Sequence, residues 1–260
     1  MKRIHLFEFE DFKAFPNFLR NSMTNYLEAF HRVIQTKIDL SLVIKKALNI
    51  SNASHIQDLC SGAGGPMPDV LHELKKESSF KNLELTLTDL YPNQQAIQKF
   101  KGVADINYQS SPVNAVENTK KEDTLVTMIC SMHHMPPKIA KEILLNAQTN
   151  KQSICVYEIS DNGFPKFLFP INFIIGIIMP FFVTPMVKKL TWHQILFTYF
   201  IPILPLLISW DGTVSNVRTY TKADWLELMG EHMQDDYVWE IETIGDKMKK
   251  IYVLGYPKPN

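Results

Sequence analysis

The sequence predicts an α/β protein built on a doubly wound, seven-stranded and mostly parallel sheet. From Ile56 onward, short apolar runs alternate with amphipathic stretches, as expected for strands that are joined by helices. The runs are apolar on both faces, which is typical of a parallel sheet covered by helices on both sides. Only a few residues join the last two runs, which predicts an antiparallel pair. The expected strands cover residues 55–60, 83–88, 105–108, 124–130, 153–159, 237–243 and 250–256.

Helices are expected at the beginning of the chain and between the strands. Over residues 12–50, apolar side chains recur at helical spacing. The other expected helices cover residues 66–76, 93–101, 136–149 and 222–233. We therefore predict four segments, which are an N-terminal helical cover (1–50), a core (51–163), a hydrophobic helical insert between the fifth and sixth strands (164–210), and the end of the core with the last two strands (211–260).

The composition excludes several classes of protein. Lys and Arg together number 27, as do Asp and Glu, so no overall charge attracts the chain to nucleic acid. The first residues, MKRIHLFEFEDF, carry early acidic side chains and no continuous apolar run, unlike a signal peptide. Cys60, Cys130 and Cys155 lack metal-ligand spacing, and an odd number of cysteines fits a reducing compartment. We expect a cytoplasmic protein without a metal site.

A glycine-rich turn follows the first expected strand. Residues 58–66 read DLCSGAGGP and lead from the strand into a helix. Small residues let the backbone approach a ligand closely, and the free N–H groups at a helix start favour an anionic group. A tight turn without a ligand is the alternative, which glycines alone do not exclude.

An acidic residue, Asp89, comes directly after the second expected strand. In this position a carboxylate can accept both ribose hydroxyls of an adenosine cofactor. The alternative is that Asp89 caps the next helix. The glycine turn upstream favours the cofactor.

The spacing of the glycines indicates which adenosine cofactor is bound. A nicotinamide-binding turn needs G-x-G-x-x-G, and here the third glycine is misplaced. Asp58 precedes the turn, where it can bind the amino group of a methionine moiety. This Asp-x-x-x-Gly-x-Gly arrangement resembles motif I of class I methyltransferases that use S-adenosylmethionine (SAM), with Cys60 where many relatives carry glycine. The resemblance implies a Rossmann-like core that binds SAM through Asp58, Cys60, Ser61, Gly62, Gly64, Asp89, Leu90, Asn114 and Ser131.

Two later segments extend the resemblance. Asn114 follows the third strand, where those enzymes often place an aspartate that reads the adenine amino group. The segment SMHHMPP (131–137) after the fourth strand is similar to the His-His-Leu-Pro segment of small-molecule methyltransferases, including those acting on quinones. The chain also resembles a group of uncharacterised bacterial methyltransferase-like proteins. That group shares TDLYPN (88–93), a double histidine, a long apolar insert and a WDG…RTY stretch (210–220).

Methyl transfer from SAM needs mainly alignment of the acceptor and exclusion of water. A base is needed only where the acceptor must lose a proton. His133 and His134 follow the fourth strand, at the edge where open α/β sheets bind ligands, so either can act as that base. We favour His134 slightly. The alternative is that one histidine caps the next helix and the other packs beside the cofactor.

Other charged residues have alternative interpretations. Glu158 ends the fifth strand and either points into the pocket or pairs with a basic side chain at its rim. Asp211 and Arg218 contact substrate or, as we favour, take part in an ion pair that steadies a loop. The acidic residues in 8–11 are expected to be solvated surface.

The insert is the most apolar part of the chain. Residues 167–187 are apolar over about the length that spans a bilayer, and residues 193–210 are slightly shorter. Five prolines interrupt these stretches, and Lys188 and Lys189 lie between them. Carrying that lysine pair across a membrane is costly and opposes the positive-inside rule. We favour a hairpin that lies at the interface or dips into one leaflet, over a spanning anchor; a helical lid or an oligomer interface is the third interpretation.

The sequence therefore predicts a cytoplasmic SAM-dependent methyltransferase, associated with the cytoplasmic face of a membrane, that acts on a hydrophobic small molecule or lipid-like acceptor. One rival is a NAD-dependent oxidoreductase. The other is a non-catalytic membrane-associated protein with a degenerate SAM fold, which Cys60 and Asn114 permit. Nucleic-acid methylation is disfavoured, since there is no basic stripe and no Asn-Pro-Pro-aromatic motif.

Overall fold

The structure is a computed structural model that describes residues 1, 3–12, 14–118, 121–163, 165–245 and 248–259. Phe164, where the predicted insert begins, lies outside these residues. The chain divides into two compact units. The sheet unit contains Met1, Lys37–Asp161 and Tyr220–Asn260, and the helical unit contains Lys2–Thr36 and Asn162–Thr219.

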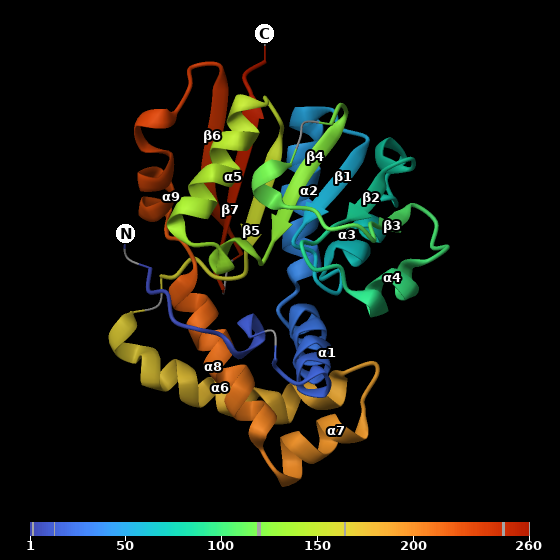
Figure 1. Ribbon diagram of the computed structural model, residues 1–260, viewed down its shortest axis with the longest axis vertical. Helices are drawn as coiled ribbons and strands as arrows, with labels where there is room; N and C mark the ends of the chain where they lie inside the picture. Colours follow the sequence, from blue (N-terminus) through green and yellow to red (C-terminus); the bar gives the residue numbers. More distant parts are fainter. Residues whose placement is uncertain (2, 13, 119–120, 164, 246–247, 260) are drawn as a thin grey trace. The chain divides into compact units, whose positions relative to one another are not determined.

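The sheet unit contains one seven-stranded sheet in the order β3-β2-β1-β4-β5-β7-β6 (Figure 1). The strands are β1 (His55–Leu59), β2 (Glu84–Leu87), β3 (Ile106–Tyr108), β4 (Thr124–Ile129), β5 (Ile154–Glu158), β6 (Tyr237–Ile244) and β7 (Lys250–Pro257). The first five are parallel, while β7 runs antiparallel to both β5 and β6. This confirms the predicted doubly wound sheet and its closing antiparallel pair.

Helices cover both faces of the sheet because side chains of each strand alternate between two apolar clusters. In β4, Leu125 and Ile129 face one cluster, and Val126 and Met128 face the other. The first cluster is completed by α2 (Thr36–Ser51), α3 (Met67–Leu74) and α4 (Gln94–Phe100), and the second by α5 (Pro137–Thr149) and α9 (Lys222–Met229). Short 3-10 turns are η2 (Ser78–Phe80), η3 (Ala115–Glu117), η4 (Met132–His134) and η8 (Gly230–His232).

The helical unit combines an N-terminal segment with the hydrophobic insert. Its longer helices are α1 (Asn17–Val33), α6 (Phe169–Val183) and α8 (Ile203–Arg218). The shorter elements are η1 (Phe9–Asp11), η5 (Lys166–Leu168), η6 (Thr184–Met186), α7 (Trp192–Ile195) and the π-helical turn η7 (Leu196–Phe200). Two small apolar clusters hold the unit together. One contains Tyr26, Ala29 and Val183, and the other contains Met23, Leu204 and Leu207.

The N-terminal acidic residues are not simply solvated surface, and that expectation was wrong for Glu8. Glu8 is buried, and its carboxylate lies 3.0 Å from the guanidinium of Arg218. Asp11 lies 2.7 Å from the same nitrogen. The oxygens of Asp211 accept the backbone N–H groups of Phe9 and Glu10 at 2.8 and 3.3 Å. These partners are about two hundred residues apart in sequence, so the local pattern around Glu8 does not reveal them.

Helix α8 extends beyond the predicted end of the insert. It continues through Asp211 to Arg218, so these two residues lie on a helix rather than on a loop. Trp210 donates its indole N–H to the carbonyl of Phe7 at 3.0 Å, and the backbone N–H of Ile4 bonds to the carbonyl of Val217 at 2.9 Å. The WDG…R stretch therefore fastens the N-terminal segment along α8.

Candidate functional site

The glycine turn between β1 and α3 has a backbone that favours glycine at three positions. Gly62, Gly64 and Gly65 have φ values of 54°, 102° and 49°. At Gly64, an added Cβ would lie 2.9 Å from the ring of Phe100, so the turn packs closely against α4. At Gly62 and Gly65, an added Cβ would meet no atom within 4 Å. The turn thus has one packed side and one open side.

Cys60 occupies another left-handed position, with φ at 56°. This conformation is costly for a residue with a Cβ, which explains why glycine suits the position. Burial raises the pKa of the Cys60 thiol to about 12, and the nearby carboxylates of Asp89 and Asp58 add to the shift. The thiol is therefore protonated near neutral pH and is not a nucleophile.

Asp58 lies buried near the end of β1 and joins three segments of the sheet unit. One oxygen accepts the hydroxyl of Thr127 on β4 at 2.6 Å, and the other accepts the hydroxyl of Ser61 at 2.7 Å. Burial raises the pKa of Asp58 to about 7, and the two hydroxyls oppose this shift only in part. Since β1 and β4 are adjacent where the strand order reverses, Asp58 lies at the topological switch point of the sheet.

Asp89 holds the glycine turn from the end of β2. Its carboxylate accepts the backbone N–H of Gly62 at 2.9 Å and that of Tyr91 at 2.8 Å. The alternative role, capping the next helix, belongs to Asn93, whose side chain accepts the N–H of Ala96 at the start of α4. Asp89 is therefore bonded to the turn itself.

The loop after β3 is tied to the same place. The backbone N–H of Val113 bonds to the carbonyl of Asp89 at 2.9 Å, which brings Asn114 next to the loop after β2. The side-chain oxygen of Asn114 accepts the N–H of Val116 and so caps η3. Leu90, in the loop after β2, is 43% exposed.

Tyr108 also belongs to this site, although its sequence position alone did not identify it. Its hydroxyl donates to the carbonyl of Gly62 at 2.8 Å and accepts the N–H of Asn93 at 3.2 Å. Its position at the end of β3 was the available signal, because the ends of parallel strands meet at one edge. Thr127 was also missed, because it lies inside β4 and not at the end of the strand.

Ser131 follows β4 at the same edge. Its hydroxyl oxygen is buried and has no hydrogen-bond partner among the described residues. A buried hydroxyl of this kind usually has a partner in the functional state, since leaving it unsatisfied costs roughly 1–3 kcal/mol.

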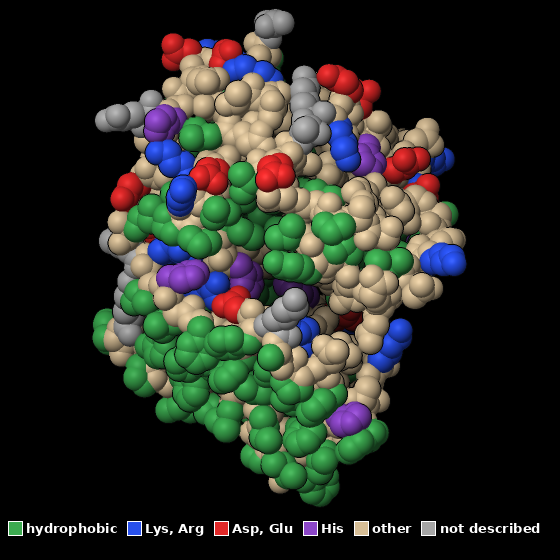
Figure 2. Space-filling model, viewed as in Figure 1, with side chains coloured by type: hydrophobic (Ala, Val, Ile, Leu, Met, Phe, Trp, Pro, Cys, Tyr) green, Lys and Arg blue, Asp and Glu red, His purple; other side chains and the backbone are tan. Residues whose placement is uncertain are grey.

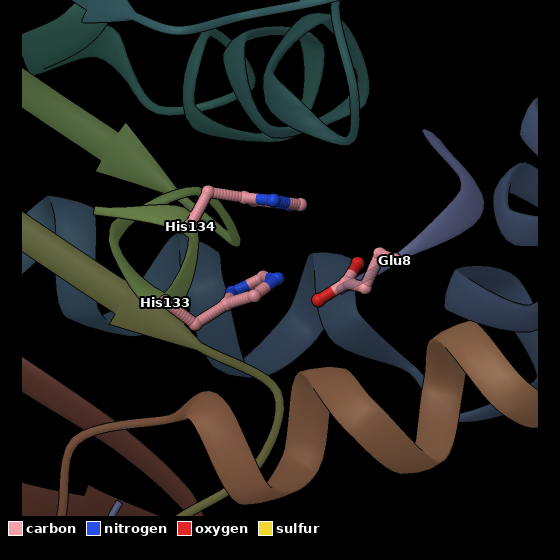
Figure 3. Close-up of side chains that lie close together, drawn as sticks. All are labelled: Glu8, His133 and His134. Carbon is pink, nitrogen blue, oxygen red and sulfur yellow. The ribbon is translucent and has the colours of Figure 1, made fainter. Parts of the chain in front are cut away.

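His133 and His134 lie together on η4, after β4 (Figure 3). Their ring centroids are 4.2 Å apart. The carboxylate of Glu158, at the end of β5, accepts the backbone N–H of His133 at 3.1 Å and lies 2.8 Å from its Nδ1. Glu158 therefore pairs with a basic side chain, as one of the two interpretations expected. A proton on Nδ1 facing this carboxylate makes Nε2 the nitrogen that carries the lone pair.

These residues share the edge at the carboxyl ends of the parallel strands. The adjacent strands β2, β1, β4 and β5 lead to Asp89, Asp58, Ser131 and Glu158 respectively. Asp211 and Arg218 belong to the helical unit, where they hold the N-terminal segment. The sheet unit thus gathers carboxylates, an amide, an open glycine turn and a carboxylate-bound imidazole at one edge.

Comparisons with known proteins support this architecture. No protein-family model matches the chain, and no curated protein matches it. Among solved structures, the plantazolicin methyltransferase BamL, in complex with a triazolic desmethylPZN analog and SAH, is 12% identical. The match covers 94% of this chain and 99% of BamL, with a TM-score of 0.53.

Two larger proteins are also similar. The mitomycin 7-O-methyltransferase MmcR is 13% identical over 92% of this chain and 54% of its own, with a TM-score of 0.47. LepI in complex with SAM is 12% identical over 79% of this chain and 43% of its own, with a TM-score of 0.45. The chain thus spans about half the length of these two proteins. Taken with the strand order, the likeness to BamL shows that the chain shares the Rossmann-like fold of that protein.

Proposed function

We propose that this protein is a SAM-dependent methyltransferase that acts on a hydrophobic small molecule or lipid-like acceptor. The observation that carries the proposal is the hydrogen bond that the backbone N–H of Gly62 donates to the carboxylate of Asp89. It brings a ribose-binding carboxylate, expected at the end of β2, against the open side of a left-handed glycine turn. Nicotinamide enzymes use a different glycine spacing, so SAM is the cofactor that suits this turn.

The surrounding residues fit the parts of SAM. Asp89 would accept the ribose hydroxyls, and Asn114, tied to it through Val113, would lie toward the adenine. Asp58 would bind the amino group of the methionine moiety, and the buried hydroxyl of Ser131 offers a further polar partner. The open side of Gly62 lets the ligand approach the backbone. When bound, SAM supplies an activated methyl group to the acceptor.

His133 would act as the base for an acceptor that must lose a proton. With Nδ1 bonded to Glu158, Nε2 can take the proton from an acceptor hydroxyl or enol. The carboxylate then stabilises the imidazolium that forms, in the same way that a buried carboxylate supports a catalytic histidine in hydrolases. This assigns the base to His133, whose Nδ1 faces the Glu158 carboxylate, whereas the sequence slightly favoured His134.

The apolar composition of the insert supports a hydrophobic acceptor. Residues 167–187 and 193–210 include many exposed large hydrophobic side chains, and exposed apolar surface of this extent marks a site of interaction. A lipid, an isoprenoid or quinone, or a polyketide-like molecule would suit such a protein. We further propose that the protein works in the cytoplasm, at the cytoplasmic face of a membrane.

A methyl-transfer assay tests the proposal. The full chain is incubated with SAM that carries a radiolabelled methyl group and with a hydrophobic extract of cells, and label in the organic phase is counted. We expect the wild type to transfer radiolabel to the organic phase, and we expect His133→Gln to abolish this transfer. His134→Gln is the matched control and should keep most of the activity. Folded protein that binds SAM but labels no extract would contradict the acceptor class, whereas folded protein that binds no SAM would contradict the activity itself.

A further inference from the structure

Helix α6 exposes a continuous apolar stripe. Its members recur at helical spacing, so they lie on one face of the helix, and each is between 48% and 70% exposed. The stripe consists of Ile171, Ile174, Ile175, Ile178 and Phe182. Scattered apolar residues are normal on a surface, but five large ones on a single helix face mark an interaction site.

The opposite face of α6 already has a partner within the helical unit. A Cβ at Gly176 would lie 2.6 Å from the hydroxyl oxygen of Ser209 on α8, so the two helices approach closely. The Ser209 hydroxyl donates to the carbonyl of Phe173, and Val183 is buried in the apolar cluster with α1. The stripe is therefore a second apolar face that α8 leaves uncovered.

Exposed aromatic residues also lie on α7 and η7. Trp192 is 66% exposed and Phe200 is 76% exposed. Tyr199 donates its hydroxyl to the carbonyl of Phe181, which links η7 to α6. Figure 2 shows hydrophobic side chains gathered over these helices. Exposed tryptophan and tyrosine beside aliphatic side chains are typical of a surface that lies at a membrane–water interface.

The charge of the insert is complementary to anionic lipid. From Asn162 to Trp210 the sequence contains no Asp or Glu. Lys188 and Lys189 are exposed just beyond η6, and Arg32 of α1 donates to the carbonyl of Met186 in the same turn. Basic side chains at the edge of an apolar face attract anionic headgroups.

The helix geometry favours lying in the membrane over crossing it. Among the described residues, one continuous helical segment, Phe169–Met186, is long and apolar enough for a span. At about 1.5 Å per residue, its 18 residues reach slightly less than the roughly 30 Å of a bilayer core. The second candidate, Trp192–Phe200 with Ile203–Arg218, bends by 87°. It ends in Arg218, which is buried in an ion pair with Glu8.

We propose that the helical unit docks on the surface of a lipid bilayer, with α6 lying in the membrane plane. The stripe of α6 enters the boundary between headgroups and acyl chains, and Lys188 and Lys189 contact anionic headgroups. This proposal does not depend on the proposed methyl transfer.

Flotation of the full chain with lipid vesicles tests the docking. One set of vesicles contains phosphatidylcholine alone, and the other contains equal parts of phosphatidylcholine and phosphatidylglycerol. We expect binding to both, with tighter binding to the anionic set. Replacing both lysines (Lys188→Gln with Lys189→Gln) should weaken binding to the anionic vesicles by on the order of tenfold, and should barely change binding to the neutral ones.

The apolar stripe is tested with Ile174→Gln combined with Ile178→Gln, which should weaken binding to both vesicle types by about tenfold or more. The matched control replaces two exposed leucines of the sheet unit, Leu42 and Leu226, with Gln, and should bind as the wild type does. Folded protein that floats with neither vesicle overturns the proposal. A stripe variant that binds vesicles as the wild type does also overturns it. The oligomeric state, measured by size-exclusion chromatography with light scattering, gives a third test: a stripe that holds two copies of the chain together and does not bind vesicles overturns the proposal too.

Discussion

Glu158 holds His133 at two points, accepting its backbone N–H at 3.1 Å and lying 2.8 Å from its Nδ1. The two contacts fix the position of the residue and also the orientation of its ring. The pair joins the end of β5 to the turn after β4, two neighbouring strands of the sheet. With Nδ1 facing the Glu158 carboxylate, Nε2 is the nitrogen that we propose as the base.

The pair predicts the effect of Glu158→Gln. The substitution keeps the shape of the side chain but removes the charge that stabilises an imidazolium, so we expect methyl transfer to fall by on the order of 10²-fold. SAM binding, measured by calorimetry, should stay within about twofold of the wild type, because Glu158 would act through His133. The pH dependence of the rate should also change, which a merely structural role would not cause. An unchanged pH profile with normal activity would contradict the assignment.

The buried carboxyl of Asp58 predicts a pH dependence of stability. Its pKa of about 7 in the folded state lies above the value of about 3.9 expected for an unfolded chain. The folded protein therefore keeps a proton that the unfolded chain releases between about pH 4 and pH 7. The stability that this group contributes is fully present below the unfolded pKa and is lost as the pH rises through the folded pKa.

Between about pH 4 and pH 7, Asp58 should lower the free energy of unfolding by up to about 4 kcal/mol. In the Asp58→Asn variant this loss of stability should be absent. Urea unfolding at several pH values measures the effect. The free energy of unfolding should still fall in part as the pH rises in the variant. The reason is that burial also raises the pKa values of Asp211 and Glu10, to about 6 and about 7. Glu84→Gln, at an exposed position on β2, is the control. A slope that Asp58→Asn leaves unchanged would show that this carboxyl is ionised in the folded protein.

The glycine turn predicts a difference between two neighbouring substitutions. Both Gly64→Ala and Gly65→Ala place a Cβ on a left-handed residue, which costs about 1 kcal/mol or slightly more. Only at Gly64 does the added atom also meet the Phe100 ring at 2.9 Å. We therefore expect Gly64→Ala to lower the thermal midpoint clearly more than Gly65→Ala does. Equal losses would mean that the turn is not packed against α4 as described.

The buried ion pair of the helical unit predicts the effect of Arg218→Met. The change leaves the buried carboxylate of Glu8 without the guanidinium that faces it, and breaking a buried pair from one side costs roughly 3–5 kcal/mol. Lys222→Met removes an exposed cation 3.6 Å from Glu242 and should cost less than about 1 kcal/mol. Urea unfolding of both variants measures the difference. Similar losses in the two variants would contradict the account of Arg218.

Much of this architecture could be predicted from the sequence because it depends on local patterns. The seven strands and their connecting helices follow apolar periodicity, and Asp58, Asp89 and the glycines follow strand ends. The partners of these residues could not be predicted, since Thr127 of β4 and Tyr108 of β3 reach the turn only through the sheet order. The pairing of Glu8 with Arg218 likewise joins two ends of the sequence. Local propensity contains no information about such contacts.

Local sequence patterns also could not predict that the two N-terminal helices pack in different units. Helices α1 and α2 are separated by only two residues, yet α1 packs in the helical unit while α2 packs on the sheet. Both are apolar at helical spacing, so periodicity alone assigns them to one cover. Which apolar surface each helix covers is decided by tertiary packing, which overrides the similarity of the two patterns.

Calorimetric titration of the purified full chain with SAM, and separately with S-adenosylhomocysteine, tests the central claim most directly. We expect both ligands to bind, and we expect Asp89→Ala to weaken binding by on the order of 10²-fold or more, because the charged hydrogen bonds to the ribose are lost. Glu84→Gln should bind as the wild type does. Folded protein that binds neither ligand, or an Asp89→Ala variant that binds both normally, would contradict the assignment of this edge of the sheet as a SAM site.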